Sequence, residues 1–145
     1  MTRRMLTALV ALVGLFVAMY LALYKAGVIG TVSCGTGGCE TVQLSQWSVL
    51  LGLPVATWGV GFYALVFGLA FAATTARFGD SRRLSLALVV LTGWGVLFSA
   101  WLTYLELFVI HAICRWCVVS AVIAVLLFVL AMLDRRAGVT LTGRV

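Results

Sequence analysis

The chain has 145 residues, of which 64% are hydrophobic and only 10% are charged, and its formal net charge is +6. Soluble domains carry roughly 45–50% apolar and about 25% charged residues, so the composition excludes an ordinary soluble domain and predicts an integral membrane protein. The positive charge does not indicate nucleic-acid binding, because the basic residues gather beside the apolar segments.

Four apolar segments divide the chain, and each is close to the ~20 residues that cross a hydrocarbon core. They cover about residues 6–24, 54–76, 84–108 and 112–133. We therefore expect an all-α membrane protein, one domain over residues 1–145, built as a bundle of four transmembrane helices. The 15 glycines fit this expectation, because small residues let transmembrane helices pack closely.

The first segment has a second interpretation as a cleaved signal peptide. Its apolar stretch is longer than the ~7–15 residues of a signal-peptide core, and no small-x-small cleavage site follows it. We expect this helix to be retained in the mature protein.

The basic residues predict the orientation of the bundle. Eight of the ten Lys and Arg fall on one side of the four segments: Arg3, Arg4, Arg77, Arg82, Arg83, Arg135, Arg136 and Arg144. The positive-inside rule places this side, with both termini, in the cytoplasm, where anionic lipid headgroups are the electrostatic partner. All four cysteines then face the outer, oxidising compartment.

The first outer loop contains one pair of cysteines, Cys34 and Cys39, in the stretch "VSCGTGGCETV". The glycines between them permit positive φ angles and the close approach of another chain.

The stretch "TVQLSQWSVLLGLP" (residues 41–54) follows the loop cysteines. Its apolar residues Leu44, Trp47 and Leu51 can share one helical face. The polar residues of the stretch point elsewhere on such a helix: Gln43, Gln46 and Ser48. We expect a short interfacial helix that caps the outer end of the bundle, the alternative being a plain re-entry segment.

The second pair, Cys114 and Cys117, forms a C-x-x-C motif at the outer start of the fourth segment. On a helix the two thiols share one face, with Cys117 about 4.5 Å deeper along the axis. The helix N-terminus and Arg115 favour the thiolate, which is the species that attacks disulfides. Two such pairs permit a relay by thiol–disulfide exchange, while a four-thiolate zinc site and two inert disulfides remain alternatives.

Glu106 and His111 lie at the outer end of the third segment. An acid within a membrane segment suggests function, and histidine can carry a proton near neutral pH. Both are candidate proton carriers, and simple solvation of Glu106 is the alternative.

The combined motifs resemble the bacterial vitamin K epoxide reductase family over about residues 6–133. The resemblance rests on the C-x4-C pair, on "CETVQLSQWSVLLGLPVATWGVGFYA" and on "YLELFVIHAICRWCVVSAVIAV". Loop cysteines after the first helix and C-x-x-C opening the fourth are that family's order. The disulfide bond formation protein B family has the reverse order, which argues against it.

The resemblance implies a thiol:quinone oxidoreductase in a bacterial inner membrane, with a quinone of the menaquinone, ubiquinone or vitamin K type in a four-helix bundle. It implies that Cys34 and Cys39 are a shuttle pair and that Cys114 and Cys117 are the active-site pair, with Cys117 beside the quinone.

The implied pocket or its cap includes Ser45, Trp47, Trp58 and Ala121. Ala121 falls where vertebrate members have tyrosine. Because no fused thioredoxin domain is expected, the implied thiol partner is a separate thioredoxin-fold, DsbA-like protein. The alternatives are true vitamin K epoxide reduction and a non-enzymatic membrane protein with structural disulfides.

Overall fold

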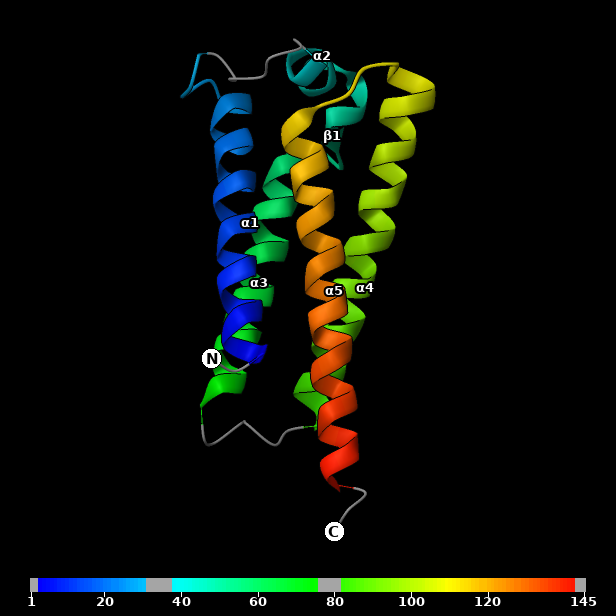
Figure 1. Ribbon diagram of the computed structural model, residues 1–145. Helices are drawn as coiled ribbons and strands as arrows, with labels where there is room; N and C mark the ends of the chain where they lie inside the picture. The colour runs from blue at the N-terminus through cyan, green and yellow to red at the C-terminus, as the bar shows by residue number, and fades with distance from the viewer. Residues whose placement is uncertain (1–2, 31–37, 76–81, 143–145) are drawn as a thin grey trace.

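The computed structural model describes residues 3–30, 38–75 and 82–142 and is a bundle of four long helices (Figure 1). The helices are α1 (Arg3–Lys25), α3 (Val55–Thr74), α4 (Arg82–Leu105) and α5 (Arg115–Thr142). Within the described residues, four helical segments are long and apolar enough to cross a membrane. The predicted all-α, four-helix, multi-pass architecture is therefore confirmed.

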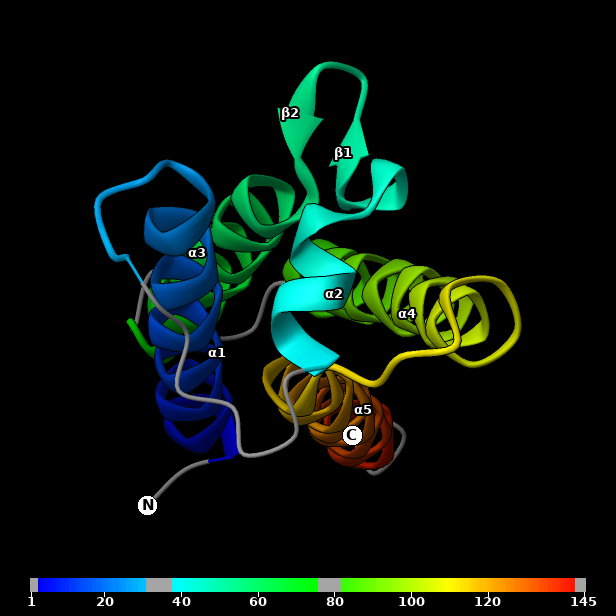
Figure 2. The ribbon, with the colours of Figure 1, turned by 90° about the horizontal axis from the view of Figure 1, so that it is seen from above.

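The bundle consists of two close helix pairs, because α1 packs mainly against α3 and α4 mainly against α5 (Figure 2). Gly14 of α1 permits the first contact, since a Cβ at this position would collide with the Tyr63 ring of α3. The contact between α3 and α4 is much smaller. Space for a cavity is therefore left on the side where α3 faces α4.

Polar contacts join the ends of α1, α3 and α5 at one end of the bundle. Arg4 forms an ion pair with Asp134 at 3.1 Å and donates a hydrogen bond to the Ala73 carbonyl at 2.9 Å. Arg3 donates to the Leu133 carbonyl at 3.0 Å. These contacts fix the relative depth of the three helices.

The opposite end of the bundle is covered by residues 38–54 (Figures 1 and 2). This region contains α2 (Gly38–Leu44), the 3₁₀ turn η1 (Gln46–Ser48), and the two-residue strands β1 (Val49–Leu50) and β2 (Leu53–Pro54). The predicted short helix in the first loop is confirmed. We call α2 together with η1 the cap.

The short helix occupies only the beginning of the stretch 41–54, because α2 ends at Leu44. The Ser45 hydroxyl donates to the Val42 carbonyl at 2.7 Å, and the Ser48 hydroxyl donates to the Ser45 carbonyl at 2.7 Å. Such local side-chain bonds compete with a regular helix. A hairpin then pairs Leu50 with Leu53 in β2, and both of its turn residues, Leu51 and Gly52, have positive φ, as in a type I′ turn.

Two polar residues of this stretch lie inside the protein, and two of its leucines lie outside. Gln43 and Ser48 are buried, while Leu44 is 73% and Leu51 84% exposed. In a membrane protein this arrangement is favourable, because the exposed leucines meet lipid and the polar groups find partners inside.

The fourth helix begins at Arg115 and not at residue 112 as expected. After α4 the chain forms one π-helical turn, η2 (Glu106–Ile110), and His111 then adopts a left-handed conformation with φ 56°. Cys114 has the N-cap position of α5, where its carbonyl accepts the Val118 N–H at 3.0 Å. The C-x-x-C motif therefore straddles the helix start.

Candidate active site

The C-x-x-C motif lies directly under the cap. Cys114 and Cys117 are free thiols, and the Cys117 backbone N–H donates to the Cys114 sulfur at 3.3 Å. Cys114 thus uses its own side chain to satisfy one of the unpaired N–H groups at the start of α5. The pair is held in one turn, where the two sulfurs can form a disulfide.

Cys39 in the cap lies in the same buried cluster as Cys114, and both residues have no solvent exposure. Gly38 explains how the two segments approach so closely, because a Cβ on Gly38 would collide with the Ile113 carbonyl oxygen. Cys39 is disulfide-bonded, which removes the thiolate that a four-cysteine zinc site would need. Cys34 lies outside the described residues.

Two polar side chains from other elements converge on the C-x-x-C motif. Gln43 of the cap directs its side-chain amide Nε2 to the Cys117 sulfur at 3.7 Å. Glu106 accepts the Cys114 backbone N–H at 3.2 Å through Oε2, and its carboxyl group lies beside the Cys117 thiol. The two thiols are therefore surrounded by hydrogen-bonding groups from α2 and η2.

The Cys114 thiol, which lies in the connection between two spanning segments, loses its proton more readily than an ordinary thiol. Hydrogen bonds from the Cys117 thiol and backbone N–H lower the pKa of Cys114, although burial and the Glu106 charge oppose them. A lower pKa makes Cys114 a better leaving group in thiol–disulfide exchange.

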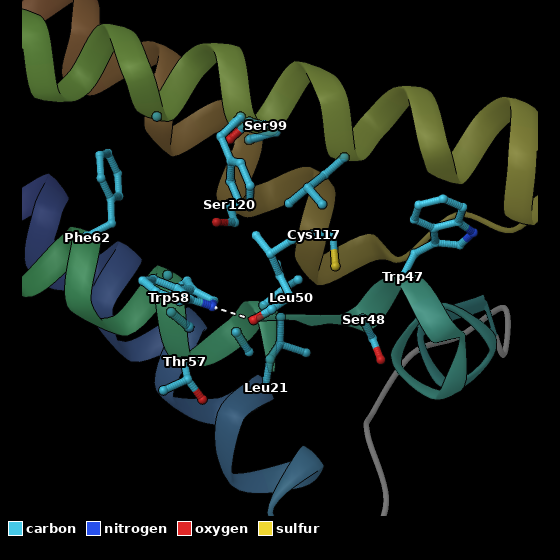
Figure 3. Close-up of a pocket in the computed structure, with 18 of the residues that line it drawn as sticks. Leu21, Trp47, Ser48, Leu50, Thr57, Trp58, Phe62, Ser99, Cys117 and Ser120 are labelled. Carbon is cyan, nitrogen blue, oxygen red and sulfur yellow. Dashed lines mark hydrogen bonds between the residues drawn. The ribbon is translucent and has the colours of Figure 1, made fainter. Parts of the chain in front are cut away.

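Beneath the cap lies a cavity of about 620 Å³ between α3, α4 and α5, with Cys117 in its wall (Figure 3). Most of its lining is apolar, and six aromatic side chains contribute: Trp47, Trp58, Phe62, Tyr63, Trp94 and Phe98. The volume of the cavity and its apolar lining match small-molecule sites, which are about 300–1,000 Å³ and largely apolar with few polar groups.

The residues predicted for the pocket or its cap meet at this cavity. Ser45, Trp47, Trp58 and Ala121 all line it, although they come from four different elements or connections. The Trp58 indole N–H donates to the Leu50 carbonyl at 3.0 Å and so attaches the hairpin to α3 (Figure 3). Ala121 leaves space where a larger side chain would project.

The two predicted proton carriers, Glu106 and His111, differ in burial and in access to the cavity. Glu106 is only 5% exposed and lines the cavity, so its expected alternative as a solvated acid is wrong. His111 is exposed and does not line the cavity.

Several polar residues of the site were not predicted from the sequence. Lys25 at the end of α1 donates to the Gln43 carbonyl at 2.6 Å and to the Ser48 hydroxyl at 2.9 Å, and so ties the cap to the bundle. The Tyr63 hydroxyl bonds the Ser120 hydroxyl at 2.7 Å beside the cavity. The charge of Lys25 in an otherwise apolar helix end was the one available signal.

Comparison with known families identifies this arrangement. The model of the vitamin K epoxide reductase family matches residues 5–132. The chain belongs to this family. A search of curated proteins found no match. Membership of the vitamin K epoxide reductase family implies a thiol–quinone oxidoreductase activity, in agreement with two cysteine regions that meet above an apolar cavity.

The cavity fits the quinone that the vitamin K epoxide reductase family uses as substrate. A quinone ring is flat and apolar with two carbonyl oxygens, and it needs aromatic or aliphatic walls with a few hydrogen-bond donors. The cavity walls contain aromatic side chains such as Trp58 and Phe62, and the side chains of Ser99, Ser120 and Gln43 add polar groups. Of the three cysteines that the structure describes, Cys117 lines this space.

Proposed function

We propose that the protein is a membrane thiol:quinone oxidoreductase that supports disulfide formation outside the cytoplasm. Electrons enter from a reduced thioredoxin-fold partner at a Cys34–Cys39 disulfide. They pass by exchange to Cys114–Cys117, and Cys117 delivers them to a quinone in the cavity.

Each step of this relay balances. The partner's two thiols become a disulfide as the Cys34–Cys39 bond is reduced, and Cys39 then attacks the Cys114–Cys117 disulfide through a mixed disulfide. Oxidation of the Cys114 and Cys117 thiols releases two electrons and two protons. A quinone supplies the matching chemistry, because it takes up two electrons and two protons to become a hydroquinone.

One observation carries the proposal, namely the continuous placement of the three described cysteines. Cys39 and Cys114 share a buried cluster, and Cys117, one turn further along, lines the apolar cavity. A structural disulfide protein has no need for free thiols beside such a cavity. Vitamin K epoxide reduction would use the same cavity and is distinguished by the substrate that is consumed.

The charge pattern supports a location in the cytoplasmic membrane with the cap on the outer side. Arg3, Arg4 and Arg82 lie at the bundle end opposite the cap. By the positive-inside rule this end is cytoplasmic. The cap and the cysteines then face the compartment in which disulfides persist.

The test uses the purified full chain in lipid nanodiscs with a reduced thioredoxin-fold protein and ubiquinone or menaquinone. We expect loss of quinone absorbance together with oxidation of the partner thiols in equal amounts. Cys117→Ala abolishes quinone reduction, whereas Val118→Ala, a change at an exposed neighbour, leaves it unchanged. Partner oxidation without quinone reduction, or full turnover by Cys117→Ala, would contradict the proposed function.

A further inference from the structure

Glu106 is an unusual residue for its position, because it is an acid buried at the outer end of a spanning segment. It is 5% exposed, and within the described part of the chain it forms no ion pair. The other described acids differ, since Glu40 is exposed and Asp134 is paired with Arg4. Placing an acid within a membrane segment is energetically unfavourable, so a buried acid at such a position is a strong candidate for a functional residue.

The Glu106 carboxyl group contacts both cysteines of the C-x-x-C motif and also reaches the cavity. Oε2 accepts the Cys114 N–H at 3.2 Å, and the carboxyl group lies beside the Cys117 thiol. Glu106 and Cys117 both line the cavity. One carboxyl group therefore connects the reacting sulfur to the space where a substrate is held.

The backbone around Glu106 is specialised to keep it there. Glu106 opens the π-helical turn η2, and its carbonyl accepts the N–H groups of His111 and Ala112. His111 adopts the left-handed conformation, which is unfavourable for a non-glycine residue. Single π-helical turns within α-helices occur frequently at functional sites. The turn folds the C-x-x-C segment back over Glu106.

Proton accounting shows what such a group is needed for. Oxidation of two thiols releases two protons, and reduction of a quinone consumes two. The apolar cavity offers little water to carry them, and a proton held within hydrogen-bond reach is transferred efficiently. A proton carrier must therefore touch the Cys117 sulfur and face the cavity at the same time.

We propose that Glu106 is the acid–base residue that carries protons from the C-x-x-C thiols to the quinone. The proposal rests on the function proposed above. The Cys117 S–H bond breaks as a Glu106 O–H bond forms, and Glu106 then gives this proton to a quinone oxygen. The Cys114 thiol, hydrogen-bonded to that of Cys117, supplies the second proton through the same carboxyl group. Two electrons leave as the Cys114–Cys117 disulfide forms.

The first test measures the carboxyl group itself, without quinone. Glu40→Gln leaves Glu106 as the sole glutamate of the chain, so ¹³C-glutamate incorporated by cell-free synthesis marks one carboxyl group. We expect its infrared band to change between the dithiol and disulfide forms, because the Cys117 S–H group beside Glu106 is lost on oxidation. A band that is the same in both forms would overturn the proposal.

The second test separates proton transfer from positioning by single-turnover reduction of quinone by the pre-reduced protein. Glu106→Gln keeps an acceptor for the Cys114 N–H but cannot exchange protons, and we expect a slowing of about 10²-fold or more, the scale of general acid–base catalysis. Glu106→Asp retains an acid and should recover part of the rate. The matched control, Glu40→Gln, should react like the parent.

The outcomes distinguish the two proposals. If the parent chain does not reduce quinone in a single turnover, the proposed function itself fails. If the parent reacts and Glu106→Gln reacts equally fast, only the role of Glu106 fails. If Glu106→Gln does not fold, the infrared test still decides the role of Glu106, because it uses the Glu40→Gln protein, in which Glu106 itself is unchanged.

Discussion

Cys114 has two roles at the residue scale, because it caps α5 and also lies in one buried cluster with Cys39 of the cap. Its sulfur accepts the Cys117 N–H, and its side chain lies in the buried cluster that contains Cys39. Both roles require the Cys114 sulfur to be held in one position, whether it is a thiolate or part of a disulfide. Two predictions follow from this position.

The first prediction is a trapped disulfide between the cap and the C-x-x-C motif. In Cys34→Ala/Cys117→Ala both resolving thiols are gone, so a Cys39–Cys114 bond should accumulate under mild oxidation. Mass spectrometry of a digest detects the crosslinked peptides. The matched control, Cys39→Ala/Cys117→Ala, should crosslink much less, and equal crosslinking in the two variants would contradict the relay.

The second prediction concerns the pH dependence of Cys114. Hydrogen bonds from Cys117 lower the pKa of Cys114, so the thiolate persists to lower pH than in a free cysteine, whose pKa is about 8.5. The rate of alkylation at Cys114, followed by peptide mass spectrometry, should therefore reach half its maximum below that pH. Cys117→Ala removes the thiol hydrogen bond and should move the midpoint upward. A midpoint unchanged by this substitution would show that the Cys117 side chain does not stabilise the thiolate.

At the scale of elements, the cap is held by few contacts, and Lys25 supplies two of them. Hydrogen bonds to a charged group contribute about 1.5–3 kcal/mol each. The backbone carbonyl of Gln43 accepts one of these bonds, while the side-chain amide of Gln43 reaches the Cys117 sulfur. The end of α1 is thereby linked through the cap to the thiol beside the cavity.

We therefore predict that Lys25→Met loosens the cap without unfolding the bundle. Amide hydrogen exchange in residues 38–48 should accelerate roughly tenfold to hundredfold, the equivalent of losing one such bond, while the core of α5 stays protected. Lys25→Arg keeps the charge and donors and is the control. Unchanged exchange in Lys25→Met would mean that other contacts hold the cap.

The contact between α1 and α3 depends on Gly14, whose missing side chain makes room for the Tyr63 ring. Gly14→Ala should overpack this contact and destabilise the protein by about 1–3 kcal/mol, measured as a lower unfolding midpoint in detergent. Gly68→Ala is the matched control, because a Cβ there meets nothing within 4 Å. Equal midpoints for the two variants would show that Tyr63 moves aside at no cost.

At the scale of the whole molecule, the asymmetry of charge along the bundle predicts the membrane orientation. Val28 beyond α1 is 72% exposed at the cap end, and Thr75 is exposed at the opposite end. A membrane-impermeant maleimide added to intact cells should label Val28→Cys above the background of the parent chain and leave Thr75→Cys unlabelled. Labelling of position 75 from outside would reverse the orientation and place the C-x-x-C motif in the reducing compartment.

The sequence by itself determined the membrane class, the four helices and the order of the cysteines, because these follow from local composition and spacing. A long apolar segment must satisfy its own backbone hydrogen bonds in lipid, so it forms a helix whatever its neighbours are. Family membership follows equally from motifs that lie along the chain.

Only the tertiary structure decided which polar groups meet at the thiols. Gln43 points inward because the cap folds across the bundle and Lys25 binds the Gln43 backbone carbonyl. Glu106 is buried because η2 and the left-handed His111 fold the C-x-x-C segment back over it. These contacts join residues far apart in the chain, and helical periodicity carries no information about which distant segment will cover a given face.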